Sequence, residues 1–152
     1  MPAFLDSSAL VKQVVDETGS DEVRRLVNSD PLLWVSELAT IEGVSALAKK
    51  VRKAEVSAQE FPELVDALAL LLAEGPFEIV PIDEAEKERA RSLLTSYAPF
   101  RNLGSLDALQ LATALSVREE LGSADLAFYC SDRRLAAAAR DQGFSVKTPG
   151  LS

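Results

Sequence analysis

The residues best suited to chemistry in this chain are four acids, Asp6, Glu42, Asp107 and Asp132. The sequence contains no histidine and a single cysteine, Cys130. Imidazole general bases, Ser-His and Cys-His nucleophilic schemes and the usual zinc sites are therefore excluded. Carboxylates remain as the obvious catalytic groups.

Asp107 opens an otherwise apolar segment, Leu-Gly-Ser-Leu-Asp-Ala-Leu-Gln-Leu-Ala-Thr-Ala-Leu, at residues 103–115. Ser105 suits the N-cap of a helix, and apolar residues from Leu106 to Val117 occur on almost every face, which is typical of a helix buried on most sides. A buried carboxylate needs a capping role, a basic partner or a cation. The alternative is a favourable interaction with the helix dipole, worth about 0.3–1 kcal/mol.

The elements that must position these acids alternate along the chain. Short apolar runs predict strands at residues 3–5, 32–35, 77–82, 126–130 and 144–146. Helical patterns and caps predict helices at residues 9–15, 22–28, 38–53, 57–75, 83–97, 106–117 and 133–142. This alternation predicts an α/β fold in which helices flank a central, mainly parallel sheet in three α/β/α layers, with residues 1–152 in one domain.

In such a sheet, the carboxyl ends of strands and the amino ends of helices meet at one edge, where ligands bind. Asp6 and Asp132 directly follow predicted strands, and Asp107 opens a helix. Glu42 lies in the second turn of the helix after the second strand, beside an apolar stripe at positions 41, 44, 48 and 51. Its neighbours on the same face are small: Ala39, Gly43 and Ala46. This flank would allow another element or a ligand to approach closely. We expect the four acids to converge at this edge.

Four converging carboxylates repel one another and resist ionisation unless a divalent cation neutralises them. Oxygen ligands without histidine or thiolate suit Mg²⁺ or Mn²⁺, which activate water and stabilise charge on a phosphoryl oxygen. The acids therefore predict phosphodiester hydrolysis. Taken singly, each has another explanation: Asp132 as a helix cap, Asp6 as a turn residue and Glu42 as part of a solvated helix face.

Four blocks of the sequence occur in the order and spacing of a known family. They lie at residues 6–10, 36–47, 106–114 and 131–136, followed by Gly143 and Pro149. Together they resemble the PIN-domain ribonucleases, specifically the VapC-type toxins of bacterial toxin–antitoxin pairs. The resemblance implies an endoribonuclease dependent on Mg²⁺ or Mn²⁺, whose catalytic and metal-binding acids correspond to Asp6, Glu42, Asp107 and Asp132.

The resemblance also assigns supporting residues. Ser8 falls where the family keeps a small polar residue beside the first acid. The family commonly has threonine or serine two residues before the last acid, and this chain departs from that pattern with Cys130; Ser131 is then the candidate to supply the hydroxyl. Glu37 is a rival to Glu42, but the register of the family block favours Glu42.

Basic residues near the predicted edge would position an RNA backbone without reading its sequence. The candidates are Lys12, Lys49, Lys53, Arg133 and Arg134. Lys49 returns to nearly the same helix face as Glu42 at a distance of about 10 Å. The net charge of −8 argues against non-specific coating of nucleic acids.

The resemblance implies a cognate antitoxin and a toxin homodimer or a toxin–antitoxin hetero-oligomer. The leucine-rich segment at residues 64–72 is a candidate surface for the antitoxin, with core packing as the alternative. The N-terminus lacks the features of a secretory signal, no apolar run is long enough to span a bilayer, and the single cysteine fits a reducing compartment. We therefore expect a cytoplasmic protein without a membrane contact.

Two other functions fit parts of the pattern. An aspartate after the first strand can be the nucleophile of a phosphoryl-acceptor or phosphatase domain, but Ser8 stands where such a phosphatase would need a second acid. The other is a PIN-fold interaction module that has lost its catalytic activity. It predicts partner binding without metal-dependent turnover.

Overall fold

The computed structural model describes residues 1–29, 31–122 and 125–151. Within these ranges, five strands form one sheet in the order β3-β2-β1-β4-β5, and every pairing in it is parallel. The strands are β1 (Ala3–Leu5), β2 (Leu33–Ser36), β3 (Phe77–Val80), β4 (Ala127–Tyr129) and β5 (Ser145–Lys147). The predicted parallel sheet is confirmed.

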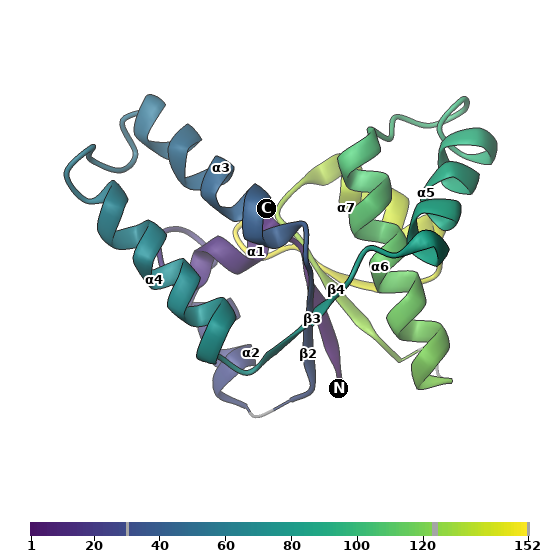
Figure 1. The fold of residues 1–152 in the computed structure, drawn as a ribbon, viewed down its shortest axis with the longest axis horizontal. Helices are drawn as coiled ribbons and strands as arrows, with labels where there is room; N and C mark the ends of the chain where they lie inside the picture. Colours follow the sequence, from purple (N-terminus) through teal and green to yellow (C-terminus); the bar gives the residue numbers. More distant parts are fainter. Residues whose placement is uncertain (30, 123–124, 152) are drawn as a thin grey trace.

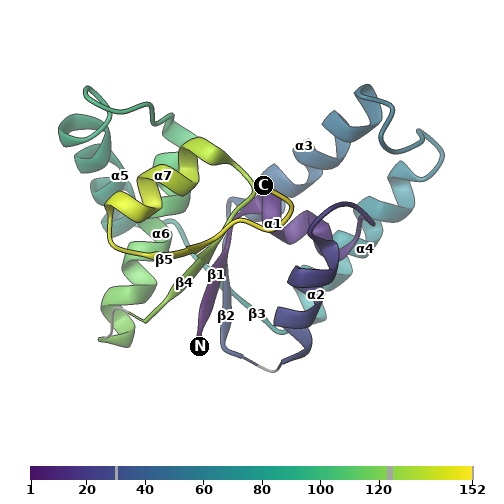
Figure 2. The same cartoon turned by 180° about the vertical axis from the view of Figure 1, so that it is seen from behind.

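Helices cover both faces of this sheet. They are α1 (Ser7–Leu10), which continues into a 3-10 turn (Val11–Gln13), α2 (Ser20–Asn28), α3 (Ala39–Arg52), α4 (Phe61–Glu74), α5 (Glu84–Ser96), α6 (Ser105–Leu121) and α7 (Arg133–Asp141). Helices α1 to α4 lie on one side of the strands and α5 to α7 on the other (Figures 1 and 2). The three-layer α/β/α architecture is therefore confirmed.

The central strand β1 contributes side chains to both hydrophobic cores. Phe4 packs with the cluster on the α5–α7 side and stacks on Phe128, with ring centroids 5.5 Å apart, whereas Ala3 and Leu5 belong to the cluster on the α1–α4 side. Successive side chains of a strand point to opposite faces, so a fully apolar strand is required here. This burial fixes Asp6, the next residue, at the centre of the sheet edge.

Helix α3 carries Glu42 and is held by close packing against α4. A Cβ atom added to Gly43 would lie 2.6 Å from Leu68 Cδ2, so the small flank predicted beside Glu42 is what allows α4 to approach. The buried face of α3 consists of Ala39, Gly43 and Leu47. Ile41, which the predicted apolar stripe placed inside, is 70% exposed because this close contact rotates it toward solvent.

Within the leucine-rich segment, core packing explains part of the pattern. Leu68 is buried against α3, whereas Leu70 is exposed.

The prediction that Ser105 is the N-cap of the helix carrying Asp107 is wrong by one residue. Gly104 is the N-cap and Ser105 is the first helical residue, which places Asp107 at the third helical position. Among the described residues, no helix is long and apolar enough to cross a membrane.

Candidate active site

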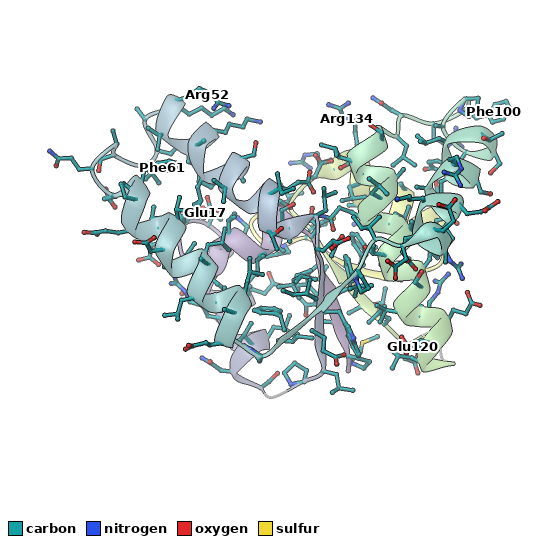
Figure 3. The ribbon with its side chains drawn as sticks, viewed as in Figure 1. Glu17, Arg52, Phe61, Phe100, Glu120 and Arg134 are labelled. Atoms are coloured by element: carbon teal, nitrogen blue, oxygen red, sulfur yellow. The ribbon has the colours of Figure 1, made fainter. Side chains whose placement is uncertain are left out.

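The structure brings all four predicted acids to one pocket of about 350 Å³. Asp6 reaches it from the end of β1, Glu42 from α3, Asp107 from the first turn of α6, and Asp132 from the N-cap of α7. Arg52, which lines the pocket, and Arg134 extend from the two helical layers at the same end of the molecule (Figure 3). The expected convergence at the sheet edge is thus observed.

Asp6 is almost completely buried, with 5% of its surface exposed. Its Oδ1 accepts a hydrogen bond from the Ala9 N–H at 3.0 Å and so caps helix α1. The Ser8 hydroxyl contacts both carboxylate oxygens, at 2.7 and 2.9 Å, and accepts a hydrogen bond from the Ser131 N–H at 2.8 Å. Ser8 therefore links the first acid to the segment that carries the last one.

Burial is the main influence on ionisation in this pocket. It raises the pKa of Asp6 to about 7 against the opposing hydrogen bonds, and the charges of Glu42 and Asp107 add to the rise. Burial also raises the pKa of Asp107 to about 6, with further contributions from Asp132 and Glu42, while Arg134 acts in the opposite direction. The carboxylates repel one another here and would gain from a nearby positive charge.

Glu42 is held by two side chains that sequence reasoning missed. Its Oε1 accepts hydrogen bonds from the Ser7 hydroxyl at 3.0 Å and from the Gln110 amide nitrogen at 2.7 Å. The same amide nitrogen lies 3.3 Å from Ser7 Oγ. The rival candidate Glu37 does not line the pocket, and its Oε1 accepts a hydrogen bond from the Ile82 N–H.

Gln110 is only 1% exposed, and its Oε1 is buried without a hydrogen-bond partner. Turning the amide nitrogen toward the Glu42 carboxylate avoids repulsion between oxygens and leaves this carbonyl unsatisfied, at a cost of about 1–3 kcal/mol. The sequence contained a signal for this role: one amide in an apolar helix, one turn after Asp107.

We expect Gln110→Leu to weaken Mn²⁺ binding and RNA cleavage by about 10- to 100-fold, because Glu42 would lose the contact that orients it. Stability should be unchanged or higher, since the substitution also removes an unsatisfied buried acceptor. Calorimetric titration with Mn²⁺ and urea unfolding measure the two effects. Thr113→Val is the matched control, because the Thr113 hydroxyl donates a hydrogen bond to the Gln110 main-chain carbonyl at 2.8 Å. Unchanged Mn²⁺ affinity in Gln110→Leu would contradict this role.

Asp132 combines a structural and a site position. Its Oδ1 accepts a hydrogen bond from the Leu135 N–H at 3.0 Å, as expected of a helix cap, and the residue still lines the acidic pocket. The Ser131 hydroxyl donates to the Pro149 carbonyl at 2.7 Å instead of to an acid. Cys130 is fully buried, and burial raises the pKa of its thiol well above the ordinary value.

The predicted basic residues differ in their accessibility. Lys49 lines the acidic pocket, Lys53 is the exposed C-cap residue of α3, and Arg133 and Arg134 are exposed at the start of α7. Lys12 is 7% exposed, and its Nζ lies 3.2 Å from Glu17 Oε1 and 2.8 Å from the Thr18 carbonyl. The apolar stem of Lys12 is packed inside and its charge is already paired.

The donor set of the pocket suits a hard cation, since it consists of oxygen atoms at the ends of four carboxylates. In the part of the chain that the structure describes, no group of three or more acidic or cysteine side chains is arranged to hold a metal ion together. Glu42 turns toward Ser7 and Gln110, and Asp132 toward its own helix.

Comparisons with known proteins agree with the fold. A model of the PIN domain matches residues 3–141. Ribonuclease VapC46 of Mycobacterium tuberculosis is 35% identical over 146 residues, which cover 96% of each chain. The structure of M. tuberculosis VapC20, described as a sarcin-ricin loop cleaving toxin, has a TM-score of 0.65 and 17% identity over 90% of this chain and 94% of VapC20. A toxin–antitoxin complex from Klebsiella pneumoniae gives a TM-score of 0.63 and 19% identity over 97% of each chain.

The PIN match spans most of the chain, and the likeness to VapC46 spans nearly all of it. The chain therefore belongs to the PIN-domain family, and within it to the VapC-type toxin ribonucleases of toxin–antitoxin systems. The two solved structures share the fold at low sequence identity. The resemblance inferred from the four sequence blocks is confirmed.

Proposed function

We propose that this protein is an endoribonuclease that depends on Mg²⁺ or Mn²⁺ and acts as the toxin of a toxin–antitoxin pair. The observation that carries the proposal is the convergence of Asp6, Glu42, Asp107 and Asp132 in one pocket, where the pKa values of two of them are raised. Ribonuclease activity is supported by the relatives, since one is named a ribonuclease and another is described as a sarcin-ricin loop cleaving toxin.

The four acids have different proposed tasks. Asp6 and Asp107 would be the principal ligands of the ion, because their ionisation depends most on a positive charge nearby. Glu42 would be held at its position by Gln110 and Ser7 through one carboxylate oxygen. Asp132 would approach from the layer of α5 to α7, opposite the layer that carries Glu42, while still capping α7. The bound ion would supply activation of water and stabilisation of charge on the phosphoryl oxygen.

The remaining residues would orient the RNA strand. Lys49 and Arg52 line the pocket and could contact phosphates there, Arg134 acts on Asp107 by its charge, and Lys53 and Arg133 would extend this rim. Lys12 is left out of this set because its charge is buried and paired with Glu17. Such contacts hold the backbone without discriminating between bases.

An antitoxin partner is also part of this proposal. The Klebsiella relative is described as a toxin–antitoxin complex, which supports an equivalent pairing here. An apolar groove of about 340 Å³ lies beside the leucine-rich segment and is lined by residues such as Val44, Leu72 and Ile79. We propose that the antitoxin binds this side of the molecule. We also propose that the protein is cytoplasmic and forms a toxin homodimer or a toxin–antitoxin hetero-oligomer.

The direct test is RNA cleavage by the purified chain, freed of any co-purifying partner, in Mg²⁺ or Mn²⁺ and in EDTA. We expect cleavage only with the metal, and a loss of at least about 10³-fold in Asp107→Asn, since removing one ligand charge weakens both ion binding and charge stabilisation. Asp125→Asn, on the loop before β4, serves as a control for loss of one acid elsewhere. Metal-independent cleavage, or equal cleavage by Asp107→Asn, would overturn the proposal; metal binding without cleavage of any RNA would favour the interaction module.

A further inference from the structure

A second cavity of about 350 Å³ adjoins the acidic pocket. The two cavities share three lining residues, Ser8, Ala46 and Lys49, so they lie side by side along α3. The second cavity, which we call the lysine cleft, is lined by Lys12, Lys49, Lys50 and Lys53 together with Glu17 and Glu55. It follows α3 away from the acids toward the C-terminal end of that helix.

The charges in the lysine cleft are only partly compensated. Glu17 lies at the centre of a paired group: its two oxygens are 3.2 Å from Lys12 Nζ and 2.5 Å from Lys50 Nζ. Glu55 lies 3.7 Å from the same Lys50 Nζ. Within the described residues, Lys49 and Lys53 have no carboxylate within 4.0 Å of their ammonium groups, and both are exposed. Two positive charges therefore remain available in a chain whose net charge is −8.

Cations in the last turn of a helix interact favourably with its dipole, which is the simpler explanation for lysines at the end of α3. That explanation covers neither Lys12, which comes from the 3-10 turn after α1, nor the cavity that the lysines enclose. The partly buried pairs around Glu17 join α3 to the segment after α1, which helps to hold Lys49 and Lys53 in the cleft.

The spacing along α3 suits a strand that passes both cavities. Lys49 lies about 10 Å along the helix axis from Glu42, and Lys53 lies about 6 Å further in the same direction. The distance of about 6 Å from Lys49 to Lys53 is similar to the distance between neighbouring phosphates of a single nucleic-acid strand. A backbone lying along α3 would therefore present one phosphate at the acids and the following ones at the two free lysines.

We propose that the lysine cleft is a phosphate-binding subsite for the RNA strand on one side of the cleaved bond, with Lys49 and Lys53 as its contacts. This inference rests on the proposed ribonuclease function and adds where the flanking strand lies. Binding there is insensitive to base sequence and sensitive to salt, because only backbone charge is recognised. The subsite acts on substrate affinity and leaves metal binding unchanged.

The test compares the double variant Lys49→Ala/Lys53→Ala with the control Lys87→Ala/Lys147→Ala, which removes two exposed lysines that do not line the cleft. Binding of single-stranded RNA is measured in an Asp107→Asn background, so that the RNA stays intact. We expect the cleft variant to bind RNA at least about tenfold more weakly than the control at moderate salt. The negative slope of log K against log[salt] should become shallower by about 1.4, the value for two lost phosphate contacts.

Two further readouts separate the subsite from the function on which it rests. In the chain with its acids intact, Lys49→Ala/Lys53→Ala should raise KM with little change in kcat and should keep its Mn²⁺ affinity. The conservative variant Lys49→Arg/Lys53→Arg should bind RNA as the parent does. If the parent cleaves RNA and the cleft variant matches the control in affinity and salt slope, the subsite is wrong and the ribonuclease stands. If the parent neither binds nor cleaves any RNA, both proposals fall.

Discussion

Asp6→Asn should abolish RNA cleavage and at the same time make the metal-free protein more stable at neutral and higher pH. Burial raises the pKa of Asp6 from 3.8 to about 7 in the folded chain. A group whose pKa is raised by folding stabilises the fold below its unfolded pKa, and this contribution is lost as pH rises through the folded value. Ionising Asp6 above pH 7 therefore costs roughly 4 kcal/mol, which asparagine avoids.

Asparagine keeps a carbonyl oxygen that can cap α1, so the main contact of Asp6 to Ala9 is retained. The expected net gain is about 1–3 kcal/mol at pH 8, because the Ser8 hydroxyl loses its charged acceptor. Urea unfolding in EDTA measures it, and the gain should disappear below about pH 3, where the wild-type carboxyl is mainly protonated in both the folded and the unfolded state. Asp66→Asn, an exposed acid of α4, should show no such dependence. A pH-independent difference, or a less stable Asp6→Asn at pH 8, would contradict the burial argument.

Metal affinity should fall steeply between pH 8 and pH 5. Both Asp6 and Asp107 must lose their protons to bind a cation, and their pKa values are about 7 and 6. At pH 8 both are ionised, whereas at pH 5 both are mainly protonated, so the apparent affinity for Mn²⁺ should drop on the order of 10²- to 10³-fold. Binding near pH 6 should release protons.

Titration calorimetry in buffers of different ionisation enthalpy measures both the affinity and the number of protons released. Thermal unfolding gives an independent readout, since Mn²⁺ should raise Tm at pH 8 and have little effect at pH 5. Asp107→Asn should bind more weakly and with a shallower pH dependence, because one of the two titrating groups is gone. An affinity that stays level across this range would mean that the ion does not bind to these carboxylates.

The sheet and the acidic pocket could be predicted because local patterns encode them. The three apolar residues before Asp6 indicate a strand buried on both faces, and strands alternating with helices imply a parallel sheet with one edge for ligands. Once Asp6 and Asp132 follow strands and Asp107 opens a helix, the topology alone brings them near one another. No side-chain geometry was needed for that step.

What the sequence did not reveal depends on contacts between distant segments. Gln110 appears as one polar residue in an apolar helix, and its link to Glu42 exists only once folding brings the two side chains, 68 positions apart, within hydrogen-bond distance. Lys12 has the composition of a surface cation, yet Glu17 and the Thr18 carbonyl draw it inside. Ile41 matched an apolar stripe, but the Gly43–Leu68 contact sets a different rotation of α3.

The acidic pocket draws its side chains from positions 6, 42, 107 and 132, and its innermost residue, Asp6, leaves the ribosome first. Strand β4 pairs with β1 and so brings Asp132 to the pocket, and β5, which is synthesised later, pairs with β4. A growing chain therefore carries three separated carboxylates and no complete centre until residue 132 has been made and β4 has joined β1. The order of the four acids along the chain therefore makes the acidic pocket a structure that assembles late, after both helical layers have contributed to it.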